Sequence, residues 1–161
     1  MEVDFDVTTN QYTGRQVIRY KNNSPDVLEK VFFHLYLNAF QQGSVMDINE
    51  RNTRGADAAI VRKFSELTAE EAGYQHVRRL TQNGKPLSFE TVGTIMEVTL
   101  AQPLKPGKSA VFEMEYEAQI PIQIRRNGRD NEEGIRYSMA QWYPKICEYD
   151  HQGWHANPYV G

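Results

Sequence analysis

Two histidines, His151 and His155, are spaced so that a helix would place both on one face, where they could share a zinc ion. The residue after the first histidine is Gln152, whose amide cannot take a proton from a zinc-bound water as a glutamate can. Gly153 and Pro158 also disfavour a helix here. We therefore interpret this stretch as a loop and expect no metal site in the chain.

The other nucleophiles and acids form no catalytic group. Cys147 is the single cysteine, so it cannot form an internal disulfide, and no base partner is identifiable beside it. The chain has no G-x-S-x-G turn and no glycine-rich phosphate loop. Three acids alternate with apolar residues, which predicts the wet face of a strand: Glu113, Glu115 and Glu117. We expect no catalytic residue in this chain.

An aromatic and amide-rich stretch runs from Tyr137 to Pro144 and is followed by Tyr149, Trp154 and Tyr159. One interpretation is a sandwich core with a packed loop. The other is a ligand-binding wall, in which aromatic rings give shape and Gln141 offers an amide donor and acceptor. The residue types favour the packed loop, and both interpretations stay open.

The charge balance excludes several kinds of partner. The 161 residues carry 18 Lys+Arg and 21 Asp+Glu, for a formal net charge of −3. A slightly acidic chain with no basic stripe is not expected to bind nucleic acid or an anionic membrane. No stretch approaches the roughly eighteen apolar residues of a membrane span, and the first residues lack a signal peptide. We expect a single soluble domain, residues 1–161.

Period-two alternation and turn residues predict a chain of short strands. Val3, Phe5 and Val7 alternate with polar residues, as in a half-buried strand. Asn83 and Gly84 predict a two-residue hairpin turn. The expected strands are 3–7, 15–21, 31–37 (a central strand covered on both faces), 75–82, 85–90, 94–100, 109–119 and 135–143.

Helical signals are few. Residues 65–73 combine a polar cap, Glu and Ala with a terminal glycine, Gly73, suited to the left-handed position after a helix. Residues 41–57 are polar and aperiodic, which predicts a long loop with short helical turns, and residues 125–134 predict a solvated tip. The fold class is therefore all-β, an antiparallel saddle-like sheet or β-sandwich with at most one or two short helices.

Several motifs resemble the N-terminal β domain of the aminopeptidase N family of zinc metallopeptidases, in a bacterial branch. The run from Arg136 to Lys145, R-Y-S-M-A-Q-W-Y-P-K, carries most of the resemblance. The segments 5–8, 12–14, 22–26, 34–40, 80–86, 120–126, 148–150 and 152–159 are similar as well. The resemblance spans nearly the whole chain.

The resemblance implies a role in peptide hydrolysis. In that family this domain precedes a zinc-binding catalytic domain and helps to bind the free amino group of the peptide substrate. The matching residue here is Gln141, with Trp142 and Tyr143 as walls of the subsite. The zinc-binding H-E-x-x-H and the G-A-M-E-N loop are not in this sequence. We therefore expect a β domain incomplete at its C-terminus, with zinc and catalytic residues in the rest of a parent aminopeptidase.

The resemblance also implies export to the periplasm or attachment to the cell envelope. A different class of function remains open. A stand-alone β-sandwich could bind carbohydrate or protein through Trp142, Trp154 and neighbouring tyrosines, or could position other domains through an exposed sheet edge.

Overall fold

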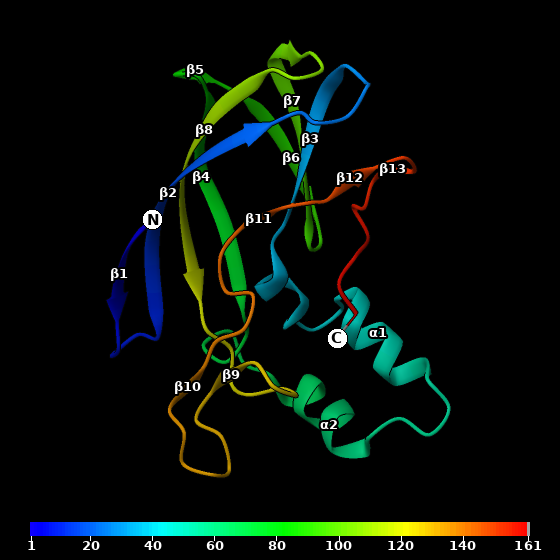
Figure 1. Cartoon of the computed structure of the whole chain (residues 1–161). Coiled ribbons are helices and arrows are strands. Elements are labelled where there is room, and N and C mark those ends of the chain that lie inside the picture. Colours follow the sequence, from blue (N-terminus) through cyan, green and yellow to red (C-terminus); the bar gives the residue numbers. More distant parts are fainter. Residues whose placement is uncertain (161) are drawn as a thin grey trace.

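A computed structural model describes residues 1–160 as two main antiparallel sheets, two two-stranded ladders and a helical segment at one end (Figure 1). The five-stranded sheet has the order β1 (Glu2–Asp6), β2 (Gln11–Lys21), β8 (Ser109–Gln119), β4 (Tyr74–Gln82) and β5 (Lys85–Pro86). The four-stranded sheet has the order β11 (Lys145–Ile146), β3 (Leu28–His34), β7 (Ile95–Leu104) and β6 (Ser88–Val92). The predicted all-β class is confirmed.

The longest ladder joins β2 to β8 over their full lengths and forms the middle of the five-stranded sheet. Its inward side chains include Phe112, Met114 and Tyr116, which are buried. The glutamates between them face outward, as predicted, and Glu117 pairs with Arg78 of β4. Period-two alternation therefore gives this sheet one apolar face and one charged face.

The core lies between the two sheets. Phe33 of β3 and Phe112 of β8 meet edge to face, with ring centroids 6.4 Å apart. Tyr116 lies over Gly14 of β2, where an added Cβ would be 2.2 Å from the tyrosine ring. Gly14 is therefore the residue that lets the Tyr116 ring pack flat on β2.

The Asn83–Gly84 turn is confirmed as a two-residue hairpin turn, with φ of +49° and +80°. The strand expected at 31–37 is wrong at both ends, because β3 spans Leu28–His34. The next residues form a 3₁₀ turn, η1 (Tyr36–Ala39), in which the Asn38 amide bonds back to the Leu35 carbonyl. This turn takes the chain out of the sheet.

One of the two helices lies where short helical turns were expected, and the other does not. The stretch 41–57 contains α1 (Val45–Asn52), and the second helix is α2 (Ala58–Glu66). The expected helix at 65–73 is wrong, since most of it lies in turns beyond α2. Gly73 does not have a positive φ. A glycine is needed there because an added Cβ would lie 2.8 Å from the Leu37 carbonyl oxygen, too close for any other residue.

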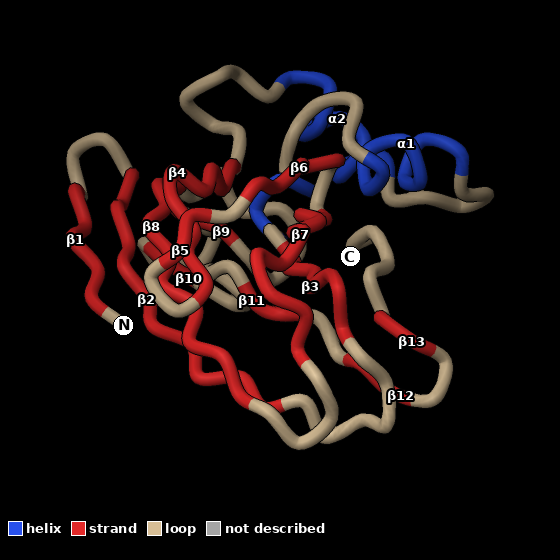
Figure 2. The backbone as a smooth tube through the Cα atoms, turned by 90° about the horizontal axis from the view of Figure 1, so that it is seen from above, coloured by secondary structure: helices blue, strands red, loops and turns tan. Residues whose placement is uncertain are grey.

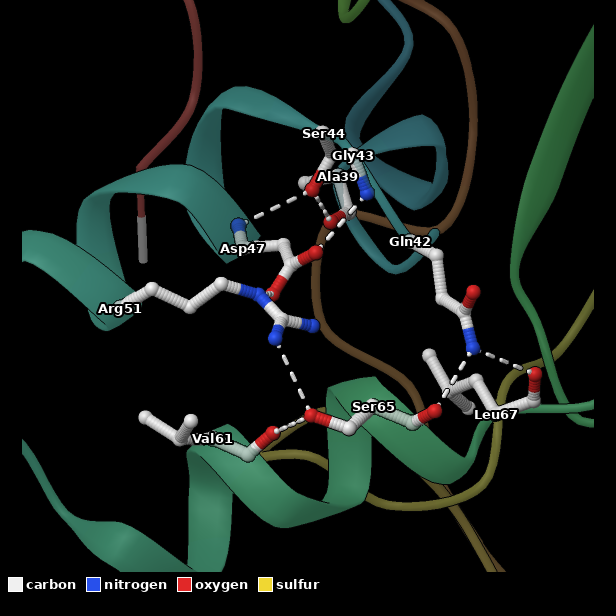
Figure 3. Close-up of polar contacts among 9 residues, drawn as sticks. All are labelled: Ala39, Gln42, Gly43, Ser44, Asp47, Arg51, Val61, Ser65 and Leu67. Carbon is white, nitrogen blue, oxygen red and sulfur yellow. Dashed lines mark hydrogen bonds and ion pairs between the residues drawn. The ribbon is translucent and has the colours of Figure 1, made fainter.

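A reciprocal cap explains why the polar residues of α1 are helical. Ser44 Oγ accepts a hydrogen bond from the Asp47 amide, and Asp47 Oδ2 accepts one from the Gly43 amide. Arg51 bonds to Asp47 Oδ1 and to Ser65 Oγ of α2, so this network links the two helices (Figure 3). The sequence signal for the start of this helix is Ser-x-x-Asp, in which aspartate replaces the longer glutamate of the usual capping box.

The last third of the chain is mostly irregular. The strand expected at 135–143 is wrong: only Tyr137–Ser138 (β10) pairs, with Gly128–Arg129 (β9). A second hairpin follows, β12 (Tyr149–Asp150) with β13 (Gly153–Trp154). Seen from above, it lies at the opposite margin of the molecule from β1 (Figure 2). No helix within residues 1–160 is long and apolar enough to span a membrane.

The first strand is more exposed than its pattern predicts. Val3 and Phe5 face the same side as the buried Tyr12 and Gly14, their partners in β2. Both side chains are nevertheless 38% exposed, and every residue of β1 is exposed. The prediction of a half-buried strand is therefore wrong, because the four-stranded sheet does not extend over β1 (Figure 2).

Candidate functional site

Gln141 lies at a sharp bend in the irregular segment 139–144. Its φ is +55°, a left-handed conformation that residues with a side chain seldom adopt. The side chain is exposed and makes no hydrogen bond to the described residues 1–160. The bend therefore presents a free amide to solvent, and the surrounding structure must supply what holds it there.

The carbonyl of the next residue is the main anchor of this bend. Trp142 O accepts a hydrogen bond from Gln75 Nε2 at 2.6 Å and another from the Tyr12 hydroxyl. Gln75 lies on β4 and is fully buried, and Tyr12 lies on β2 and is 3% exposed. Both donors come from the five-stranded sheet, so the bend is fixed directly to the most regular part of the fold.

Two further buried amides fix the ends of the segment. Asn127 Oδ1 accepts from the Ala140 amide at 3.1 Å, and Gln16 Nε2 donates to the Pro144 carbonyl at 2.9 Å. Gln16 and Asn127 are 4% and 5% exposed. We call Tyr12, Gln16, Gln75 and Asn127 the polar clamp. It brackets Gln141 on both sides and makes no hydrogen bond to its side chain.

Burial fixes the protonation state of the clamp tyrosine. Desolvation raises the pKa of Tyr12 far above its ordinary value, and the nearby Tyr116 phenol acts in the same direction. The Tyr12 hydroxyl therefore stays protonated and remains a hydrogen-bond donor to Trp142 O. Gln75 supplies a donor that does not titrate at all.

The two aromatic residues after Gln141 serve packing as well as shape. The Trp142 ring meets Tyr12 edge to face, with centroids 5.8 Å apart, and meets Tyr143 at 5.4 Å. Both residues are half-buried, so each keeps part of its surface in solvent. The structure thus places Gln141, Trp142 and Tyr143 together on one clamped segment. Their roles in substrate binding stay predictions.

The other aromatic residues do not join this site. Trp154 packs against Tyr20, Phe32 and Tyr149 at the β12–β13 hairpin, and Tyr159 packs against Tyr36. Trp142 and Trp154 therefore have different packing partners. The structure gives no shared aromatic platform from these two tryptophans.

The histidine pair lies in and just after the β12–β13 hairpin rather than in a helix. His155 Nε2 lies 2.9 Å from Asp150 Oδ2, and His151 Nδ1 lies 3.8 Å from the same oxygen. The hydrogen bond from the Gln152 amide and the nearby His155 lower the pKa of Asp150. Within residues 1–160, no group of three or more His, Cys, Asp or Glu side chains is arranged to hold a metal ion.

Sequence reasoning missed the polar clamp. The alternation of inward and outward side chains places Gln16 and Gln75 on the inward face of their strands. A buried glutamine needs a hydrogen-bond partner. The identity of that partner, a loop more than sixty residues away, could not be read from the pattern. Asn127 was placed in a solvated tip, which is wrong because both it and Gly128 are buried.

The chain resembles solved zinc metallopeptidases. A two-domain M1 zinc metallopeptidase mutant bound to L-tryptophan aligns with 82% of this chain at 16% identity and a TM-score of 0.47. The M1 zinc metallopeptidase from Deinococcus radiodurans aligns with 82% at 17% identity, also with a TM-score of 0.47. A mutant of the latter bound to a Tyr-Ser-Ala substrate gives the same values.

The alignments cover only a part of those proteins. The chain spans 22% to 23% of their length. No family profile matches the chain, and no curated protein matches it.

Proposed function

We propose that this chain is the N-terminal substrate-anchoring domain of a zinc-dependent aminopeptidase, an enzyme that removes residues from the free amino end of peptides. The observation that carries the proposal is the presentation of Gln141, exposed on a left-handed bend whose neighbours are fixed by the polar clamp. The motif R-Y-S-M-A-Q-W-Y-P-K supports it independently, because the resemblance assigns amine binding to this glutamine.

The chemistry of an amide suits this task. A peptide's free amino terminus is an ammonium that donates hydrogen bonds, and the Gln141 carbonyl oxygen can accept one. An acceptor held at a fixed position sets the distance from the amino end to the scissile bond, which favours cleavage after the first residue. The clamp matters here because a loosely held glutamine would lose conformational freedom when the substrate binds.

The zinc of such an enzyme does not fit the residues of this chain. The nearest approach to a ligand set is Asp150 with His151 and His155, and within residues 1–160 no group is arranged to hold a metal. The zinc ligands and the general base therefore belong, under this proposal, to another part of the parent enzyme. Trp142 and Tyr143 would line the subsite for the first residue of the peptide, and export to the cell envelope is the proposed location.

The experiment that tests the proposal uses the natural gene product that contains this chain. We expect it to hydrolyse amino-acid p-nitroanilides and free-amino peptides, to leave N-acetylated peptides intact, and to lose activity to a zinc chelator and regain it with zinc. A zinc-loaded, folded gene product that cleaves no free-amino peptide in a broad panel would overturn the proposal. Equal cleavage of acetylated and free peptides would overturn the amine-anchoring role alone.

A further inference from the structure

The outer edge of β1 is open. In the five-stranded sheet β1 pairs only with β2, and no backbone hydrogen bond within residues 1–160 reaches its other side. Both views show β1 at the margin of the molecule with no ribbon beyond it (Figures 1 and 2). An open strand edge carries unpaired amide and carbonyl groups that can receive another strand.

The opposite edge of the same sheet is protected. There β5, which is only Lys85 and Pro86, covers Thr81 and Gln82 of β4, and the rest of β4 is irregular between Val77 and Arg79. Lysine, proline, short length and a bulge all disfavour strand addition. By contrast β1 has five residues, Glu2 to Asp6, without lysine, proline or a bulge. The two edges therefore differ, because β1 is a continuous strand whose acidic side chains are its one feature that opposes pairing.

The side chains of β1 determine which strand fits. Glu2, Asp4 and Asp6 occupy one face, and Val3 and Phe5 occupy the other. None of the three carboxylates forms an ion pair within residues 1–160. A matching strand would carry basic residues on the acidic face and apolar residues beside Val3 and Phe5.

Space is available on the acidic face. An open cavity of about 550 Å³ lies next to β1 and is lined by Asp4, Asp6 and Glu117, with Tyr74 on the far wall. Glu117 already pairs with Arg78, so Asp4 and Asp6 are the carboxylates left for a partner. Long lysine or arginine side chains could extend along this cavity.

A second copy of this chain does not meet these requirements. If two β1 strands paired with their apolar faces together, Glu2, Asp4 and Asp6 of one copy would lie opposite the same acids of the other. Like charges directly opposite in a ladder destabilise the pair. Any register that avoids this places carboxylates beside Val3 and Phe5, which is unfavourable as well.

We propose that β1 is a docking edge for an extended segment of a partner protein in which lysine or arginine alternates with apolar residues, added as an antiparallel strand. The proposal does not depend on the aminopeptidase assignment, because it uses no residue of the Gln141 segment. Main-chain hydrogen bonds to β1 would supply affinity, and Asp4 and Asp6 would select the basic residues.

The test uses the 161-residue chain and the synthetic peptide acetyl-Lys-Val-Lys-Ile-Lys-amide, followed by fluorescence anisotropy and by amide NMR shifts. We expect saturable binding that weakens as salt is added, with the largest shifts at Glu2 to Asp6. The double variant Asp4→Asn with Asp6→Asn should weaken binding roughly threefold to tenfold, since each exposed ion pair contributes modestly. Asparagine keeps the oxygen that accepts from the Thr8 amide, so the turn after β1 is preserved.

Three controls keep the test decisive. Glu90→Gln, an exposed acid on the edge strand β6 of the other sheet, should leave the Kd unchanged. The peptide acetyl-Glu-Val-Glu-Ile-Glu-amide should not bind, nor should acetyl-Lys-Pro-Lys-Pro-Lys-amide, which cannot pair as a strand. Absence of binding, equal binding of the acidic peptide, or shifts away from β1 would overturn the proposal. A concentration-dependent dimer through β1 would show instead that a second copy is the occupant.

Discussion

The segment 140–144 and strand β1 are held in opposite ways. The first has no regular backbone pairing, yet its amides and carbonyls are bonded to Asn127, Gln75, Tyr12 and Gln16, all buried. The second has a regular ladder to β2, yet all its residues are exposed and its outer edge is open. Regular secondary structure is therefore not what anchors a segment to the core here. Buried polar side chains fix the irregular segment, and the regular strand is left accessible.

The largest effect is expected from Gln75→Leu. This removes a fully buried donor to Trp142 O and the acceptor of the Leu37 amide, so two buried backbone groups lose a partner. We expect the free energy of unfolding to fall by about 1 to 3 kcal/mol. Urea denaturation monitored by tryptophan fluorescence measures it.

The matched control is Gln102→Leu, an exposed glutamine on β7 whose side chain makes no hydrogen bond within residues 1–160. It should change the free energy of unfolding by less than about 0.5 kcal/mol. A cost for Gln75→Leu as small as that of the control would contradict the view that buried amides hold the Gln141 segment.

A smaller effect of opposite sign is expected from Gln141→Gly. Glycine adopts the φ of +55° without steric cost, so relief of the left-handed conformation should raise the free energy of unfolding by about 0.5 to 1 kcal/mol. Gln141→Ala keeps the Cβ and should bring no gain. Thermal unfolding of both variants measures the difference. Equal stability of the two variants would mean that the bend is not strained.

A third test concerns pH at the far end of the clamped segment, where β11 pairs with β3. Burial lowers the pKa of His34, and the positive charge of Lys145 opposite it acts in the same direction, whereas Glu148 opposes them. His34 therefore takes up a proton more readily in the unfolded chain than in the folded chain, so protonation favours unfolding. Stability is expected to be full above pH about 6.5, the ordinary histidine value, and to decline as the pH falls below it.

His34→Gln should flatten that decline. His151→Gln serves as the control, since its side chain is 83% exposed in the β12–β13 turn. Urea midpoints measured from pH 7.5 to 5 at constant ionic strength give the slopes, with pH 6.5 as roughly the point where they should separate. Identical slopes for wild type and His34→Gln would remove His34 as the cause.

The smallest effect is expected in β1. Asp4→Asn changes an exposed carboxylate without an ion-pair partner in residues 1–160, so the free energy of unfolding should change by less than about 0.5 kcal/mol. Chemical denaturation measures it. A loss of more than about 1 kcal/mol would mean that Asp4 stabilises the sheet, and β1 would no longer contrast with the clamped segment.

The sequence predicted what depends on local pattern. Alternation located the ladder strands, including 109–119 in full, and Asn83–Gly84 located its turn, because side-chain direction and positive φ are local properties. It failed where tertiary contacts decide. The residue pattern of 139–144 is compatible with a strand. In the structure, however, the backbone groups of Trp142 and Ala140 bond to the side chains of Gln75 and Asn127 and not to a neighbouring strand. Phe5 looked buried because no local pattern reveals how far the second sheet extends.

The role of Gln141 in substrate binding stays a prediction, and the sequence did not predict how the residue is held. Gln141 was found by the resemblance of its surrounding motif, and its exposure and positive φ were not predictable from residue type. The clamp residues are separated from it by up to about 130 positions in the chain, as for Tyr12 and Trp142. Only the fold brings them together.

The most direct test of the central claim is steady-state kinetics of the natural gene product with Gln141→Ala. Loss of one charge-assisted hydrogen bond to the substrate ammonium should raise KM and lower kcat/KM for free-amino peptides roughly tenfold or more. Gln152→Ala, an exposed glutamine in the β12–β13 turn, should leave kcat/KM unchanged. Unchanged kcat/KM for Gln141→Ala in a folded, active enzyme would contradict the account.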